Sequence, residues 1–432
     1  MVGLPNDNTI VSLITAAGTG QRSDNIVHRT LRAIRLHLGM EVAYISEFAG
    51  ERTTLLEVDA PGLEGLIQPG DSQSLDDVYC RHILAGRLPQ LMPNTAAEPL
   101  AAAMSITHRF SIGKHISVPI ILPDGGLFGM FCCFGFTADD SLQDRDVQMM
   151  KAFADLTAIE INRYHEAKRD AAEKHLRIRN IIEKQQISII YQPIWDIVRR
   201  CPLGAECLAR FSTMPSRPPD EWFGEASETG QGTELELAAI RLALAALGAF
   251  SADTYLAVNV SPATILSGQL QKALEGIPVE RVVLEVTEHT HVADYATLLE
   301  QLGPLRRCGL RLAVDDAGAG YSSLRHILQL RPDIIKLDRA LTHRIDLDPS
   351  RRALASALVR FSEETNSKII AEGVETYSEL NTLRGLGIVA AQGYFLGRPQ
   401  PLDELVNLYE RDLARRTIHP STLGGSQPSY PT

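Results

Sequence analysis

Apolar residues recur with a helical period at the start of the chain and then in strand-like runs. Residues 25–38 carry apolar side chains three or four positions apart, which predicts an amphipathic helix. Four strand-like runs come later, and Pro-Asp-Gly-Gly separates the last two, which favours a hairpin. These runs are residues 41–48, 53–58, 116–122 and 127–136. A helix, antiparallel strands and a closing helix together predict an α+β sensory domain over residues 8–165.

A long helix is predicted over residues 144–186, because neither proline nor glycine occurs inside this segment. Apolar residues recur three or four positions apart along it, at Val147, Met150, Ala154, Ile161, Tyr164, Ala171, Ile178 and Ile182. Thr157, Lys168 and His175 interrupt this seam. Two interpretations stay open. The segment is either a dimerising coiled-coil signalling helix or a domain-closing helix that continues into a solvated linker.

From residue 187 onward, short β-branched strands alternate with amphipathic helices. The predicted strands are residues 187–194, 204–210, 255–261, 281–288, 311–316, 334–338, 368–375 and 391–396. Eight strands with helices between them predict an α/β fold, a TIM-type (β/α)8 barrel over residues 180–412. The tail over residues 418–432 is rich in Ser, Gly and Pro and is expected to be disordered.

Length and composition are consistent with two unequal globular domains. The chain has 432 residues, of which 44% are hydrophobic and 22% charged. No apolar run reaches the roughly 20 residues of a membrane helix, and the N-terminus lacks a signal pattern. We therefore expect a cytoplasmic protein without membrane association. The net charge of -11 disfavours nucleic-acid polymers as partners, although a small anion could still bind through metal ions.

The cysteines show no metal-binding or disulfide pattern. No C-x-x-C pair occurs among Cys80, Cys132, Cys133, Cys201, Cys207 and Cys308. Neither a disulfide scaffold nor a zinc site is expected, and reduced, mostly buried thiols are the favoured interpretation.

Acidic and amide side chains stand near the C-terminal ends of most predicted barrel strands, where such barrels build their active sites. They are Glu206, Asn259, Glu285, Glu288, Asp315, Asp316, Asp338, Glu372, Glu375 and Gln392, with Lys336 among them. For any single residue, helix capping or an ion pair in the rim is the better explanation. For the whole set, that explanation is poor.

Carboxylates that converge in one barrel mouth would repel each other by several kcal/mol unless cations neutralise them. Because no cysteine or histidine stands at these strand ends, Mg²⁺ or Mn²⁺ is favoured over zinc. The adjacent Asp315 and Asp316 suit two ions roughly 3.5–4 Å apart that share a bridging carboxylate. Such a site performs in-line attack on phosphodiesters.

The order and surroundings of these residues resemble the EAL family of cyclic di-GMP phosphodiesterases over about residues 180–410. The matching stretches are 191–193 (YQP), 206–210 (ECLAR), 259–261 (NVS), 284–288 (LEVTE), 315–324 (DDAGAGYSSL), 336–338 (KLD), 371–375 (AEGVE) and 392–394 (QGY). Each motif is short, but their joint order and spacing are specific.

The resemblance implies hydrolysis of cyclic di-GMP to linear pGpG with two divalent metal ions. The residues that match the family's metal ligands are Glu206, Asn259, Glu285, Asp315, Asp316 and Glu372. Lys336 matches the lysine that positions and polarises the attacking water, and the expected catalytic residues are Lys336, Glu206, Asp316 and Glu372. The expected substrate contacts are Arg210 to phosphate, Gln192 to guanine, and Gln392, which also matches a supporting residue. The other supporting residues are Asp338, Glu375 and Glu288, which anchors the loop after Asp316.

Three positions depart from the family pattern. Cys207 replaces an alanine, with little expected effect because the side chain points out of the barrel and behaves as a small hydrophobe. Ala317 and Ala319 stand where the family usually has phenylalanine and threonine. These changes are expected to lower the rate or weaken regulation without removing a ligand.

The N-terminal half resembles a GAF sensory domain at residues 79–81 (YCR), 86–89 (GRLP) and 129–136. Cys80, close to His82, could attach a bilin or sense redox state, but a buried structural cysteine is favoured. The neighbours Cys132 and Cys133 are expected to face opposite ways, as core and edge residues. Whether this domain binds a small ligand or none stays open.

Three hypotheses differ in class. The leading one is an active, metal-dependent phosphodiesterase that forms a homodimer through the barrel and the connecting helix and is regulated by the GAF-like domain. The second is a receptor that binds cyclic di-GMP without cleaving it, motivated by Ala317 and Ala319. The third is an interaction scaffold, in which Glu206→Ala would leave function unchanged.

Overall fold

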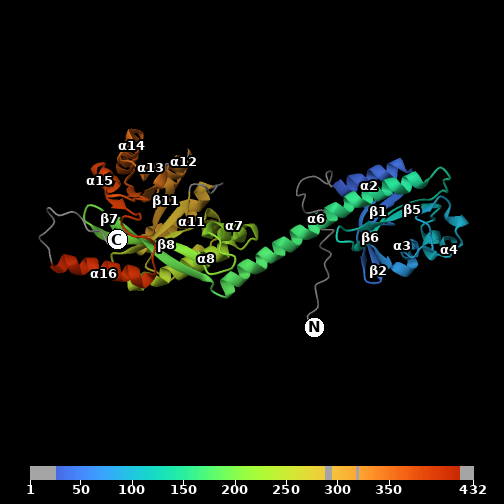
Figure 1. Ribbon diagram of the computed structural model, residues 1–432, viewed down its shortest axis with the longest axis horizontal. Helices are drawn as coiled ribbons and strands as arrows, with labels where there is room; N and C mark the ends of the chain where they lie inside the picture. The colour runs from blue at the N-terminus through green and yellow to red at the C-terminus, as the bar shows by residue number, and fades with distance from the viewer. Residues whose placement is uncertain (1–25, 288–293, 318–320, 419–432) are drawn as a thin grey trace. The chain divides into compact units, whose positions relative to one another are not determined.

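The computed structural model describes residues 26–287, 294–317 and 321–418. The chain divides into two compact units, and the division falls between Asp170 and Ala171, inside helix α6 (Asp144–Glu183) (Figure 1). Glu288, Ala319 and all of the predicted tail except Ile418 lie outside the described residues. None of the described helices combines the length and the apolar composition needed to cross a lipid bilayer.

The N-terminal unit is built on a six-stranded sheet with the order β3-β2-β1-β6-β5-β4. Its strands are β1 (Val42–Ala49), β2 (Arg52–Asp59), β3 (Ser72–Ser74), β4 (Leu91–Met92), β5 (Lys114–Ile121) and β6 (Leu127–Gly135). Its helices besides α6 are α2 (Ile26–His37), α3 (Tyr79–Leu84), α4 (Pro99–Ala103) and α5 (Ser105–Arg109), with 3-10 turns η1 (Leu75–Asp77) and η2 (Thr95–Ala97). The predicted helix and four predicted strands are confirmed, whereas the short β3, β4 and α3 to α5 were not predicted.

Alternation along the strands divides this unit into two cores. On one sheet face, Ile45 and Phe131 pack with Leu31 of α2 and Met150 of α6, and Figure 1 shows both helices on that side. On the other face, strand residues pack with α3 to α5. Cys132 and Cys133 do face opposite ways, but both are fully buried. The predicted edge position is wrong because β6 is a central strand.

Helix α6 is covered at both ends by its own chain. Val147, Met150 and Ala154 are buried in the core of the N-terminal unit, and Ile178 is fully buried in the second unit. These seam positions therefore serve packing within each unit, as the domain-closing interpretation expects. Dimerisation through this helix stays a prediction.

The second unit is a closed barrel with the strand order β10-β11-β12-β13-β14-β7-β8-β9. The strands are β7 (Ile187–Asp196), β8 (Cys201–Phe211), β9 (Tyr255–Asn259), β10 (Val282–Thr287), β11 (Arg311–Ala317), β12 (Ile334–Leu337), β13 (Lys368–Ala371) and β14 (Ala390–Ala391). The helices are α7 (Pro219–Glu228), α8 (Gly232–Leu244), α9 (Pro262–Leu266), α10 (Leu270–Ala273), α11 (Tyr295–Arg307), α12 (Tyr321–Leu330), α13 (Arg339–Thr342), α14 (Pro349–Thr365), α15 (Tyr377–Gly385) and α16 (Leu402–Ile418), with 3-10 turns η3 (Ala245–Ala249) and η4 (Val279–Arg281).

The predicted α/β barrel is confirmed, with one difference from a uniform parallel barrel. Strand β7 runs antiparallel to both β8 and β14. A short turn after Asp196 joins β7 to β8, and such a connection makes a hairpin, whereas parallel neighbours need a long crossover. Strands β13 and β14 also end earlier than predicted, so Glu372, Glu375 and Gln392 lie just beyond them.

Candidate active site

The barrel interior has an apolar layer below a polar layer. Ala257, Val283, Ala313, Ile334, Ile370 and Ala390 belong to one buried cluster. Because side chains alternate along a strand, the residue two positions further on faces the same way and lies nearer the C-terminal mouth. Those residues are Asn259, Glu285, Asp315, Lys336, Glu372 and Gln392. The apolar layer therefore closes the floor of a polar site.

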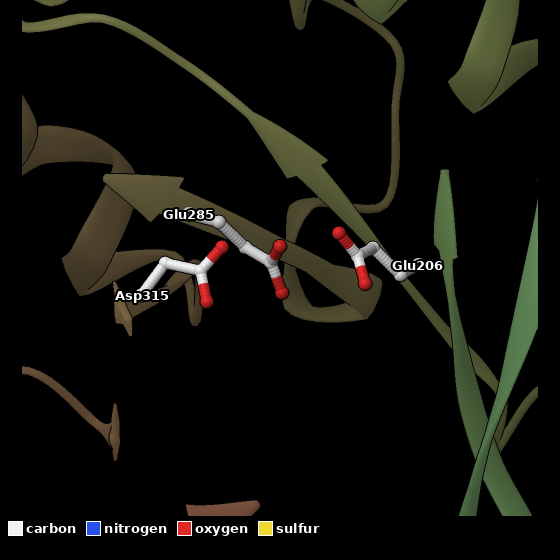
Figure 2. A group of neighbouring side chains, drawn as sticks. All are labelled: Glu206, Glu285 and Asp315. Carbon is white, nitrogen blue, oxygen red and sulfur yellow. The ribbon is translucent and has the colours of Figure 1, made fainter. Parts of the chain in front are cut away.

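Two groups of carboxylates in this mouth have the spacing of metal ligands. Glu206, Glu285 and Asp315 each offer an oxygen, and these oxygens lie within 4.8 Å of one another. Figure 2 shows the three carboxylates gathered between their strands. Asp315, Asp316 and Glu372 form a second group within the same limit. Asp315 is common to both groups, so it is placed to bridge two cations.

Lys336 places its ammonium among four of these carboxylates. Its Nζ lies 2.8 Å from Glu285 Oε2 and 2.8 Å from Glu372 Oε1. Asp315 Oδ1 is 3.1 Å away, and Glu206 Oε2 is 3.6 Å away. The lysine side chain is 1% exposed, so the interaction takes place away from bulk water. One buried cation therefore contacts both groups.

Gln392 contacts one carboxylate from each of the two groups. Its Nε2 donates hydrogen bonds to Glu206 Oε2 at 2.6 Å and to Glu372 Oε1 at 3.0 Å. Its Oε1 has no partner among the described residues. The amide fixes the orientation of two candidate ligands, which is how outer groups tune metal sites.

Burial and mutual repulsion change the acidity of the cluster. Burial, with Glu206 and Asp315 nearby, holds the pKa of Glu285 well above its usual range, although Lys336 opposes this. The pKa of Glu372 is raised for the same reasons. Burial would lower the pKa of Lys336, but four carboxylates raise it well above normal. The ammonium therefore stays charged, and the carboxylates lack sufficient positive charge without further cations.

The backbone brings two adjacent aspartates into one site. In regular strand geometry, Asp315 and Asp316 would face opposite sides. The pairing of β11 with β12 shifts register between Val314 and Ala317, and Asp316 adopts φ +58°. Asp316 N donates to Asp315 Oδ1 at 3.0 Å. This local irregularity lets both carboxylates reach the second group, and aspartate tolerates positive φ better than most residues.

A cavity of about 550 Å³ lies between strands β8 and β9 and helices α7 and α8, and its lining includes none of the clustered carboxylates. Arg210, at the end of β8, and Asn259, at the end of β9, both line it. The Arg210 side chain makes one described hydrogen bond, from Nη1 to Ala209 O at 2.8 Å, which leaves other guanidinium donors for a ligand. Gln192 pairs in register with Glu206, and its Nε2 donates to Gly397 O at 3.3 Å.

Two predicted supporting residues lie outside the cluster. Asp338 caps α13 by accepting from Ala340 N at 2.7 Å, and Glu375 pairs with Arg339 at 2.7 Å. Their described contacts support the loops around the site rather than the cluster. Glu288 and the loop residue Ala319 are not described, while Ala317 is fully buried.

Two residues outside the predicted site, Thr342 and Glu379, hold the loop after β13. Thr342 Oγ1 donates to the backbone oxygen of Glu372. The carboxylate of Glu379, 2% exposed, accepts from Arg344 N at 2.8 Å, Glu375 N at 2.9 Å and Thr376 N at 3.0 Å. Thr376 and Glu379 form a capping box, and the T-x-x-E spacing is a signal that could have identified Glu379.

A family model for the EAL domain matches residues 175–399. The chain belongs to the EAL domain family. A model for the GAF domain matches residues 23–161, so the resemblance proposed for the N-terminal half is confirmed as well.

The EAL barrel is similar to parts of larger bacterial proteins. It is 31% identical over 241 residues to the bifunctional diguanylate cyclase/cyclic di-GMP phosphodiesterase MucR of Pseudomonas aeruginosa, a match covering 53% of this chain and 35% of MucR. It is 31% identical over 183 residues to the probable cyclic di-GMP phosphodiesterase PdeD of Escherichia coli, covering 41% of this chain and 31% of PdeD. The chain thus matches about a third of the length of these curated relatives.

A solved structure extends the likeness to both units. The EAL enzyme Bd1971, in its cAMP and cyclic-di-GMP bound form, aligns with a TM-score of 0.54 at 16% identity, covering 86% of this chain and 93% of Bd1971. At this identity, the likeness concerns the fold alone.

In the GAF unit, a small cavity of about 30 Å³ lies against the face of the sheet that α3 to α5 cover. Thr53 and His115 line it, and Thr53 Oγ1 and His115 Nδ1 have no partner among the described residues. Cys80 also lines this space and is 2% exposed. Its burial agrees with the favoured interpretation of a structural cysteine.

Proposed function

We propose that the EAL barrel hydrolyses cyclic di-GMP to linear pGpG with the help of two divalent ions, Mg²⁺ or Mn²⁺. The observation that carries this proposal is the pair of oxygen-only ligand groups that share Asp315 and surround Lys336. The names of MucR and PdeD, which refer to cyclic di-GMP phosphodiesterase activity, support the choice of substrate.

The donor set fits two hard divalent cations. The residues that would hold them are Glu206, Asn259, Glu285, Asp315, Asp316 and Glu372. Such ions would polarise the scissile phosphate and lower the pKa of a bound water. Five carboxylates face a single ammonium, so full ionisation leaves about four negative charges, which two divalent ions balance.

The remaining side chains have distinct proposed roles. Lys336, a permanent donor at the centre of the cluster, orients the attacking water toward the phosphate. Arg210 binds a substrate phosphate through its free guanidinium donors. Gln392 holds Glu206 and Glu372 through its amide nitrogen and has its oxygen available to substrate. Gln192 contacts a guanine, and Asp338, Glu375 and Glu288 support the loops.

We also propose a division of labour along the chain. Residues 8–165 form a sensory GAF domain, the helix over 144–186 carries its signal, and residues 180–412 form the catalytic barrel. Two copies associate through the barrel and the connecting helix. Support for the signalling role comes from α6, which packs in the cores of both units.

Turnover of cyclic di-GMP by the full chain tests the proposed function. Purified protein with Mg²⁺ or Mn²⁺ should yield linear pGpG, detected by chromatography, and Glu206→Gln should abolish the product. Arg179→Gln, which removes an exposed ion pair with Glu183, is a matched control and should keep full activity. Binding without product would identify a receptor instead. If the folded protein neither binds cyclic di-GMP nor forms pGpG, the proposal is contradicted.

A further inference from the structure

The last turns of helix α6 are packed onto helix α7 of the barrel unit. Ile178 and Ile181 of α6 are 0% and 1% exposed. They belong to the same buried cluster as Trp222 and Ala226 of α7. A movement of this end of α6 would therefore have to displace or carry α7, because close-packed side chains transmit shifts.

Charged residues reinforce this contact. Glu225 of α7, whose side chain is 7% exposed, accepts from Arg177 Nε of α6 at 2.7 Å and from Arg217 Nη1 at 2.7 Å. One turn earlier on α6 and one turn later on α7, Lys174 pairs with Glu228 at 3.1 Å. Glu225 thus joins α6 to the segment that leads from β8 into α7.

Another side of α7 faces the cavity between β8, β9 and α8. Pro219, Asp220 and Phe223 line this cavity together with Arg210 and Asn259. Helix α7 therefore contacts both α6 and a cavity that Arg210 lines.

The end of β8, which contains Arg210, packs against helix α7. Phe211, the next residue, packs against Trp222 with ring centroids 5.9 Å apart and against Phe223 at 5.6 Å. The guanidinium of Arg217 lies over the ring of Trp222, 4.6 Å from its centroid. The position of Arg210 thus depends on α7.

The carboxylate cluster is held from a different part of the barrel. Lys336 comes from β12, and Gln392 follows β14. Their described contacts are with the cluster itself and not with α7. Glu206 lies on β8, as Arg210 does, but its carboxylate is held by Gln392 at 2.6 Å and lies 3.6 Å from Lys336. A shift of α7 would therefore affect Arg210 more than the carboxylate cluster.

We propose that Glu225 is a positioning residue that couples the connecting helix α6 to the Arg210 side of the site, so that changes in α6 alter the affinity for cyclic di-GMP and leave divalent-ion binding unchanged. This inference rests on the proposed function.

The test compares the full chain with Glu225→Gln, which removes the charge at nearly constant volume. We expect KM for cyclic di-GMP to rise about tenfold, while kcat and the Mn²⁺ concentration for half-maximal activity change less than about twofold. A merely structural defect would lower kcat and metal affinity together. Glu183→Gln, which removes the exposed Arg179 pair on the same helix, should leave all three values unchanged.

Two further variants cover the case in which Glu225→Gln fails to fold. Arg177→Gln keeps the Arg217 half of the bridge and should raise KM in the same direction, by less. Arg177→Lys keeps the charge and should restore KM to near the wild-type value. An unchanged KM in folded Glu225→Gln or Arg177→Gln, with active wild type, overturns this inference alone.

If the wild type binds without turnover, the same comparison uses the Kd from calorimetry, with the same expected rise. A wild type that neither binds nor hydrolyses cyclic di-GMP contradicts the proposed function and this inference together.

Discussion

Lys336 and Glu285 form a fully buried ion pair, with Nζ 2.8 Å from Oε2 and both side chains 1% exposed. The lysine is the one cation described within the cluster, and it also contacts Glu206, Asp315 and Glu372. It therefore has two roles that can be separated, neutralisation of the carboxylates and the proposed activation of water.

Lys336→Met tests both roles. Methionine fills similar space without charge, so the protein without metal should lose about 3–5 kcal/mol of stability, as expected when one partner of a buried pair is removed. Excess Mn²⁺ should recover part of that loss, because bound cations replace the missing charge. Turnover should nevertheless stay at least about 100-fold below wild type. Denaturant titrations with and without Mn²⁺, together with pGpG assays, measure the two effects. Turnover within tenfold of wild type would exclude the proposed role.

Gln392 is expected to act through its two hydrogen bonds to candidate ligands. Gln392→Leu removes both donors, so the Mn²⁺ concentration for half-maximal activity should rise about 10- to 100-fold. The matched control is Gln271→Leu, because the exposed Gln271 side chain donates to the backbone oxygen of Gln301 and not to a candidate ligand. Metal titrations of activity distinguish the two variants. If both variants need the same Mn²⁺ concentration for half-maximal activity, the two hydrogen bonds of Gln392 are not needed for metal binding.

His115 makes the stability of the GAF domain depend on pH. Burial lowers its pKa to about 3, so the imidazole stays neutral when folded, whereas the unfolded chain takes up a proton below about pH 6.5. The unfolded state binds more protons between these values, so stability falls as pH falls. From pH 7 to pH 5 the loss should be about 2 kcal/mol.

Denaturant titrations monitored in the GAF domain test this expectation. His115→Gln should flatten the dependence between pH 5 and 7. The exposed His108 on α5 provides the control, and His108→Gln should keep the wild-type slope. The same slope in both variants would assign the pH dependence to other groups.

Much of the cluster was predictable because strand periodicity is a strong constraint. Once Ile334 faces the barrel interior, Lys336 must face it too, and the same reasoning applies to Val283 and Glu285. Because the ends of parallel barrel strands converge, these side chains come together, and this can be predicted without the loop structures. The family resemblance added roles to positions that this pattern had already selected.

Two features depend on local contacts and connections that the sequence pattern does not show: the contacts of Asp338 and the direction of β7. Asp338 could cap α13 or face the cluster, and the structure shows the cap, because Ala340 N lies two residues further on. The supporting role of Asp338 near the site stays a prediction. The antiparallel β7 escaped prediction because strand direction depends on the connection after Asp196 rather than on the residues of the strand.

Asp316 combines a ligand role with an unusual backbone, and different substitutions separate the two. Its φ of +58° favours Asn and Gly over Ala. Asp316→Asn should keep the stability of the wild type to within about 0.5 kcal/mol, whereas Asp316→Ala should lose about 1 kcal/mol more. Both variants remove a carboxylate from the group that contains Asp315 and Glu372. Calorimetric titration should therefore show two bound Mn²⁺ ions per wild-type chain and a single tight site in Asp316→Asn, with turnover lowered at least about 100-fold. Two unchanged sites in Asp316→Asn would place the second ion elsewhere, and a stable Asp316→Ala would show that the positive φ carries no strain.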